Sequence, residues 1–157
     1  MKAVVNSFII AIAMYSKIPM PKTAWNPKNM KYTLCFFPVI GVVIGALLYA
    51  WGRVCMEFGY GQMCFAFVGT VLPVIVTGGI HLDGFMDTAD ALHSYEKREK
   101  KLAILKDPHV GAFAVIALAG YFFLYAAGLT QIWKTDHLLL LAISFVISRD
   151  LSGLSLV

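Results

Sequence analysis

The sequence predicts an all-α fold, a polytopic bundle of helices embedded in a membrane. Of the 157 residues, 59% are hydrophobic and only 14% are charged, whereas soluble domains are nearer half apolar and a quarter charged. The chain also contains four stretches of about 20 predominantly apolar residues, the length that a helix needs to cross a bilayer. We therefore expect a single membrane domain over residues 1–157, with four or five membrane segments.

The predicted spans are residues 34–58, 62–80, 110–133 and 138–157. The first contains Gly41 and Gly45, a small-xxx-small spacing that permits close helix packing. A shorter apolar run, residues 3–15, would be a fifth segment that is interfacial, re-entrant or tilted.

The basic residues predict the orientation of these spans. One group precedes the first long span and another lies between the second and third: Lys2, Lys17, Lys22, Lys28, Lys31, and then Lys97, Arg98, Lys100, Lys101 and Lys106. By the positive-inside rule, the N-terminal segment and residues 81–109 should face the cytoplasm. The links 59–61 and 134–137 should face the other side of a cytoplasmic membrane. Because this orientation accounts for the basic residues, the net charge of +4 does not indicate a nucleic-acid partner.

The chain finishes at SRDLSGLSLV, inside or at the end of the fourth predicted span and without a closing basic flank. We therefore expect residues 1–157 to be the N-terminal portion of a longer protein.

Three aspartates follow the second span, in GGIHLDGFMDTADALHS at residues 78–94. If the helix continues through them, Asp83 and Asp87 are four residues apart and Asp87 and Asp90 three, so all share one face. Like charges at this spacing repel one another, and the segment has no basic residue. A divalent cation would neutralise them. The alternative is a set of solvated surface acids balanced by the basic run 97–106.

Oxygen ligands alone favour Mg²⁺ or Mn²⁺ over zinc. Because Mg²⁺ usually completes its shell with water and substrate phosphates, the aspartates predict a metal site for a substrate that carries a diphosphate.

Four other residues are candidates. His81 is a base beside the aspartates or an interfacial histidine. Lys106 could contact a phosphate, and Asp107 is a ligand or a cap of its loop. Arg149 lies within the fourth span, where a charged residue is a functional candidate with a geometry that suits phosphate. Its alternative is an ion pair with Asp150.

The segment GGIHLDGFMDTADAL resembles the signature of the cobalamin synthase family, the adenosylcobinamide-GDP ribazoletransferases, which join the lower nucleotide loop to cobinamide. Further blocks match along the chain: SKIPMP, FFPVIGVVIGAL, ILKDPHVGAFAV and the SR of the fourth span. Together they extend over essentially the whole chain. Lys17 stands where the family usually has arginine.

The resemblance implies a transferase reaction of cobalamin biosynthesis. The 5′ oxygen of α-ribazole, or of its 5′-phosphate, would attack the cobinamide-side phosphate of adenosylcobinamide-GDP and expel GMP. Mg²⁺, or else Mn²⁺, would be held against the diphosphate by Asp83, Asp87 and Asp90. One of these carboxylates, with His81 nearby, would take the proton of the attacking hydroxyl.

Lys106 and Arg149 would then stabilise the charge on the leaving GMP. The partners are therefore the two substrates and the lipid bilayer. A homo-oligomer is compatible with the sequence, which does not set the number of subunits.

Two other functions compete with this interpretation. A CDP-alcohol phosphotransferase also uses aspartates and Mg²⁺ at a membrane edge, but its Asp-Gly-x-x-Ala-Arg opening is absent, because Asp87 and Thr88 stand where alanine and arginine are needed. A cation transporter would place polar residues deep in several spans, and the first three spans have almost none. A non-catalytic membrane scaffold leaves the aspartates unexplained.

Overall fold

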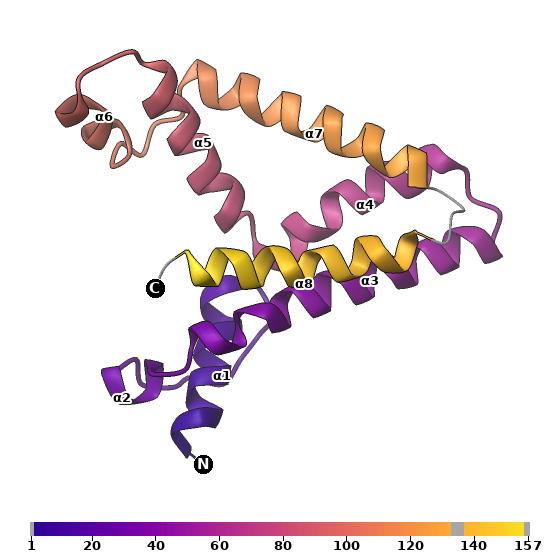
Figure 1. The fold of residues 1–157 in the computed structure, drawn as a ribbon, viewed down its shortest axis with the longest axis horizontal. Coiled ribbons are helices and arrows are strands. Elements are labelled where there is room, and N and C mark those ends of the chain that lie inside the picture. Colours follow the sequence, from indigo (N-terminus) through magenta and orange to yellow (C-terminus); the bar gives the residue numbers. More distant parts are fainter. Residues whose placement is uncertain (1, 133–136, 156–157) are drawn as a thin grey trace.

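The computed structural model describes residues 2–132 and 137–155, and every regular element within them is helical. Figure 1 shows their arrangement. In chain order the elements are α1 (Lys2–Tyr15), α2 (Pro27–Met30), the 3₁₀ turn η1 (Leu34–Phe36), α3 (Phe37–Glu57), α4 (Gln62–Thr77), α5 (Ile80–His93), α6 (Arg98–Ile104), α7 (Ala112–Ile132) and α8 (Leu138–Leu154). The predicted all-α fold is confirmed for this part of the chain.

The long helix α3 is the centre of the packing, and α8 runs antiparallel along it (Figure 1). Gly41 faces the backbone of Phe145, and Gly45 faces that of Ala142, so that neither glycine leaves room for a Cβ atom. The predicted close packing at this spacing is therefore confirmed, and the neighbouring helix is α8.

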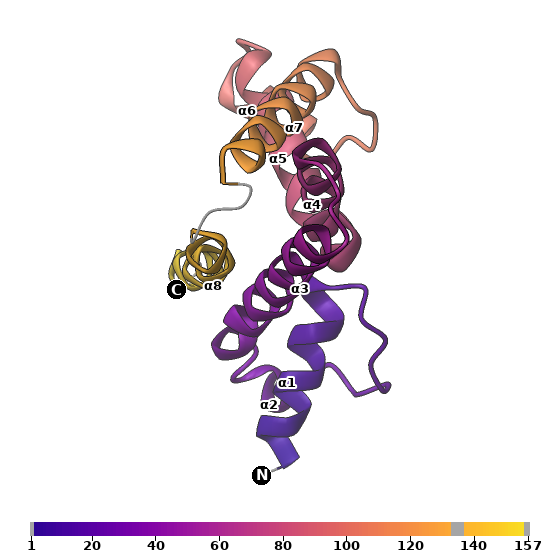
Figure 2. The ribbon, with the colours of Figure 1, turned by 90° about the vertical axis from the view of Figure 1, so that its right-hand side faces the viewer.

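Two apolar clusters form the core on either end of α3. One joins α3 to α4, α7 and α8 through Leu48, Cys55, Phe65, Ala66, Leu129 and Leu138. The other joins α3 to α1 and to the end of α4 through Ile12, Phe37, Ile40, Ile44 and Val76. Figure 2 shows the result, with α1 and α2 at one end of the molecule and α5, α6 and α7 at the other.

A sharp corner separates α4 from α5. The two helices are bent by 96°, and the residues between them, Gly78 and Gly79, have φ angles of +65° and +81°. Glycine occupies this left-handed region without the steric penalty of a Cβ, and two such residues in succession end α4. The aspartate segment is helical, as predicted, but it does not continue the second span in a straight line.

Fewer helices than predicted can cross a membrane. In the described residues, Pro27–Glu57 and Ala112–Ile132 are long and apolar enough, and α4 with α5 adds a third only if the bent pair is one span. The expected four or five segments are therefore too many. Helix α4 has 16 residues, or about 24 Å at 1.5 Å per residue, which is short of a hydrocarbon core about 30 Å thick.

The other two predicted segments are also short. Helix α8 has 17 residues and carries Arg149 and Asp150 near its end, and α1 has 14 residues. The end of the predicted fourth span at residues 156–157 lies outside the described residues, as do Trp133 and residues 134–136 of the link before that span.

Helix α7 confirms the membrane character of the chain. It is apolar throughout, yet of its 21 residues only Ala114 and Leu129 are buried. Phe123 and Leu124 are 75% and 77% exposed. A helix that is apolar all round and uncovered by its own chain is typical of a protein surrounded by lipid.

Candidate functional site

Helix α5 carries the residues predicted to act in catalysis and metal binding. It begins directly after the corner, and its first turn closes with a bond from the Asp83 backbone N–H to the Gly79 carbonyl oxygen at 2.9 Å. Asp83 therefore lies in the first helical turn, where the helix dipole favours a negative charge. The corner fixes both the direction of α5 and the position of its first carboxylate.

A cavity of about 790 Å³ lies at this corner, bounded by α1, α4, α5 and α7. Its charged lining residues are Lys17, directly after α1, and Asp83. The two side chains form no ion pair with each other in the described part of the chain. The cavity therefore presents one cation and one carboxylate to whatever enters it.

Lys17 is held in place by the end of α4. Its backbone N–H donates to the Val76 carbonyl oxygen at 2.8 Å, a group left without an intrahelical partner because α4 ends here. The Lys17 stem then runs against Gly78, where a Cβ atom would collide with it. Lys17 is not among the site residues predicted from the sequence, although the SKIPMP block that contains it is a usable signal.

Asp87 lies one helical turn beyond Asp83 and therefore on the same face of α5. Asp83 is exposed and Asp87 is half-buried. Within residues 2–132 and 137–155, neither carboxylate accepts a hydrogen bond or forms an ion pair. Both side chains are thus free to bind a ligand.

Asp90 has a different environment. Its Oδ2 accepts a bond from the Gly111 backbone N–H at 2.6 Å, and its Oδ1 accepts one from the Ala114 backbone N–H at 2.8 Å. These N–H groups lie directly before α7 and in its first turn, where a helix has no intrahelical partners for them. A Cβ atom at position 111 would meet the same carboxylate at 2.5 Å. Asp90 therefore caps α7 from α5 and joins the two helices.

His81 and Arg149 meet in a second cavity of about 200 Å³, which Tyr121 also lines. The guanidinium carbon of Arg149 lies 5.9 Å from the centre of the Phe37 ring. Its Nε is buried without a hydrogen-bond partner among the described residues. The alternative ion pair with Asp150 is not formed there, so the Arg149 charge remains available to a ligand.

The two cavities are neighbours, because Val74, Thr77 and Leu82 line both of them. His81 and Asp83 thus emerge from the first turn of α5 on either side of this shared wall. The structure brings His81 together with Arg149, and Asp83 together with Lys17.

Asp107 is engaged in its own loop. Its Oδ1 accepts bonds from the backbone N–H of His109 at 2.9 Å and from the His109 ring Nδ1 at 2.6 Å. These bonds hold the pKa of Asp107 below its usual value. The expected loop-capping alternative therefore describes Asp107. Lys106 is exposed and pairs with no carboxylate in the described part of the chain.

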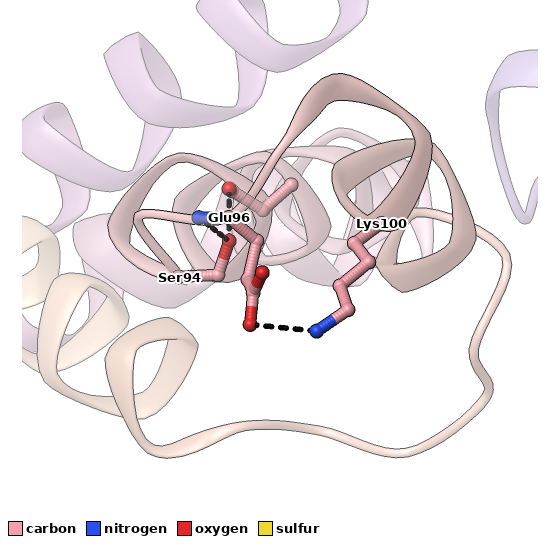
Figure 3. Close-up of polar contacts among 4 residues, drawn as sticks. Ser94, Glu96 and Lys100 are labelled. Carbon is pink, nitrogen blue, oxygen red and sulfur yellow. Dashed lines mark hydrogen bonds and ion pairs between the residues drawn. The ribbon is translucent and has the colours of Figure 1, made fainter.

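The basic run forms no contact ion pair with the aspartates in the described part of the chain. Lys100 pairs with Glu96 at 3.0 Å, and the Glu96 backbone N–H donates to the Ser94 hydroxyl at 3.4 Å (Figure 3). Lys101 donates to the Leu92 carbonyl oxygen at 3.4 Å. Among the described residues, no lysine or arginine lies within ion-pair distance of Asp83, Asp87 or Asp90.

The three aspartates predicted to bind a metal differ in their surroundings. Across the described ranges, no three His, Cys, Asp or Glu side chains gather in a way that could hold a metal ion, because the Asp90 carboxylate is turned toward α7. Asp83 and Asp87 remain. Mg²⁺ is commonly bound through one or two carboxylates together with water and substrate phosphates, so these two carboxylates are the ones left for the predicted ion, and the metal site stays a prediction.

Comparison with known proteins identifies the family. The sequence model of the family described as Cobalamin-5-phosphate synthase matches residues 7–157. The chain belongs to this family.

Curated members of the family cover nearly the whole chain. A protein of Lachnoclostridium phytofermentans is 44% identical over 152 residues, which are 97% of this chain and 58% of that protein. One of Clostridium perfringens is 36% identical over 98% of this chain and 61% of that protein. One of Listeria monocytogenes is 33% identical over 85% of this chain and 54% of that protein. Each is named adenosylcobinamide-GDP ribazoletransferase.

The chain therefore spans about three fifths of the length of the first two of these relatives. No solved structure matches it. Membership of the cobalamin-5-phosphate synthase family confirms the resemblance seen in the sequence, and it goes against both a phospholipid-synthesis transferase and a cation transporter.

Proposed function

We propose that the protein containing this chain is an adenosylcobinamide-GDP ribazoletransferase of cobalamin biosynthesis. The observation that carries the proposal is the family match over residues 7–157. The surroundings of α5 support it, because Lys17 and the free carboxylate of Asp83 line one cavity there and Arg149 lines its neighbour. This is the charge pattern expected where a diphosphate is bound and cleaved.

The proposed reaction is a phosphoryl transfer. The 5′ oxygen of α-ribazole, or of its 5′-phosphate, forms a bond to the cobinamide-side phosphorus of adenosylcobinamide-GDP. The bond from that phosphorus to the oxygen of GMP breaks, and GMP leaves with the electron pair. The hydroxyl proton passes to a base in the first turns of α5. The candidates for this base are His81, Asp83 and Asp87.

In this proposal Asp83 and Asp87 hold Mg²⁺, or Mn²⁺ in its place. The bound ion would supply neutralisation of the diphosphate charge. Each carboxylate contributes an oxygen ligand from the same face of α5, and the substrate phosphates would complete the shell. Asp90 fixes the orientation of this face, because its carboxylate accepts two hydrogen bonds from the backbone at the start of α7.

Arg149 would stabilise the negative charge that develops on the leaving GMP. Its Nε lacks a partner in the described part of the chain, and a guanidinium fork suits phosphate oxygens. We also propose that α5 faces the cytoplasm from a cytoplasmic membrane, since the segment that follows it, residues 97–106, carries the basic residues that the positive-inside rule places there.

The substitution Asp87→Asn in the full-length enzyme tests this proposal. It should abolish GMP release from adenosylcobinamide-GDP in the presence of α-ribazole and Mg²⁺, because one of the two carboxylates that hold the ion is lost. Membrane insertion should be unchanged. The matched control is Glu99→Gln, which removes an exposed acid from α6 and should retain full turnover. Wild-type turnover by Asp87→Asn would contradict the proposed role of this carboxylate.

A further inference from the structure

We propose that Lys17 binds a phosphate of the nucleotide-linked substrate in the cavity at the α4–α5 corner, opposite Asp83. This inference rests on the proposed function and adds a substrate-binding residue to it. The cavity of about 790 Å³ falls within the usual range for sites that bind small molecules, about 300–1,000 Å³.

Lys17 is the charged donor of this cavity. The other charged lining residue is Asp83, and most of the wall is apolar. The two lining hydroxyls are already used, because Ser16 donates to the Ile12 carbonyl oxygen at 2.6 Å and Thr77 donates to that of Pro73 at 2.8 Å. A phosphate entering the cavity would therefore find its cationic donor in the Lys17 ammonium.

The two opposite charges select the kind of ligand. A bare anion would be attracted by Lys17 and repelled by Asp83, and a bare cation would experience the reverse. A diphosphate that chelates a divalent cation satisfies both, since the ion meets the carboxylate and the phosphate oxygens meet the ammonium.

The fold also prepares the position of Lys17. Its backbone is bonded to Val76, and its stem passes over Gly78. The same glycine that turns the chain toward Asp83 thus leaves the space in which the lysine lies. The corner brings both charges to one cavity from segments that are far apart in the sequence.

Binding of GDP with Mg²⁺ to the full-length protein in lipid nanodiscs, followed by calorimetry, tests the inference. Lys17→Met should weaken binding by about tenfold or more, the loss expected for one hydrogen bond from a charged donor. Lys17→Arg should retain binding. Lys22→Met is the matched control, since Lys22 lies in the same segment but lines a different cavity, and it should bind as the wild type does.

A pair of glycine variants provides a second test. Both Gly78 and Gly79 have positive φ angles, so alanine strains the backbone at either position, but only at Gly78 does it collide with Lys17; at Gly79 the nearest atom is 4.0 Å away. Gly78→Ala should therefore weaken GDP binding several-fold more than Gly79→Ala. Equal effects of the two variants would contradict the placement of Lys17.

Wild-type affinity in Lys17→Met, or no binding by the wild type, would overturn the inference. Release of GMP by the wild-type enzyme, measured in parallel, keeps the two proposals apart. If the wild type releases GMP and Lys17→Met binds GDP normally, only the role of Lys17 is refuted. If the correctly inserted wild-type enzyme, given adenosylcobinamide-GDP and α-ribazole together, releases no GMP, the proposed function is refuted.

Discussion

Asp90 differs from the other two aspartates because both of its carboxylate oxygens accept backbone hydrogen bonds from the start of α7. A carboxylate in this position accepts hydrogen bonds from backbone N–H groups that have no acceptor within α7. Its negative charge also interacts favourably with the dipole of α7. The residue therefore supports the orientation of α5, and in the proposed function Asp83 and Asp87 are the aspartates that contact the ligand.

The substitution Asp90→Ala should lower the free energy of unfolding by about 2 kcal/mol, through loss of a helix cap and of hydrogen bonds to a charged acceptor. Thermal unfolding of the purified full-length protein, monitored by circular dichroism, would measure the effect. Asp83→Ala is the control, because its carboxylate accepts no hydrogen bond in the described residues. A change in Asp90→Ala no larger than that in Asp83→Ala would argue against the cap.

The sequence was sufficient to predict that the three aspartates lie on one helix, because their spacing of four and three residues matches the helical repeat. It could not predict the partner of Asp90, since Gly111 and Ala114 are more than 20 positions away and offer only backbone groups. Lys17 was missed for a similar reason, because only the folded corner brings it near Asp83.

At the scale of elements, the contact between α3 and α8 places Arg149 beside the site. Gly41 and Gly45 allow the two backbones to approach so closely that a Cβ atom at either position would meet the backbone of α8. The spacing of these glycines predicted such packing but not its partner. Small residues at this spacing are a common device for tight packing between membrane helices.

The substitution Gly45→Ala should destabilise the protein, because a methyl group would force α8 away from α3. Gly120→Ala is the matched control on α7, where a Cβ atom meets no atom within 4 Å. It should be neutral or stabilising by up to about 1 kcal/mol, the usual difference between glycine and alanine in a helix interior. Thermal unfolding of both variants measures this, and a Gly45→Ala variant as stable as Gly120→Ala would contradict the close contact.

The corner between α4 and α5 shows where element prediction fails. Glycine is compatible with both helical and left-handed backbone, so GGI in the sequence does not decide between a continuous helix and a turn. The structure places both glycines at positive φ and bends the chain by 96°. The bond from Lys17 to Val76 supports the turn by using a carbonyl that a continuous α4 would keep for itself.

For the whole molecule, composition was enough to predict a helical membrane protein but not the number of spans. Apolar content indicates how much of the chain is kept away from water, whereas a membrane span also needs an uninterrupted apolar helix of about 20 residues. The glycine corner shortens α4, and the charged end of α8 lies close to the site. These interruptions are what place His81, Asp83 and Arg149 around one end of α5.

The central claim is that Asp83 and Asp87 hold a divalent cation together with the phosphates of the substrate. The most direct measurement is Mn²⁺ binding to the full-length protein by electron paramagnetic resonance, with and without GDP. We predict that GDP tightens Mn²⁺ binding in the wild type and in Asp90→Asn. Asp83→Asn and Asp87→Asn should abolish this effect. Mn²⁺ binding that is the same in all four proteins, or that is lost only in Asp90→Asn, would contradict the claim.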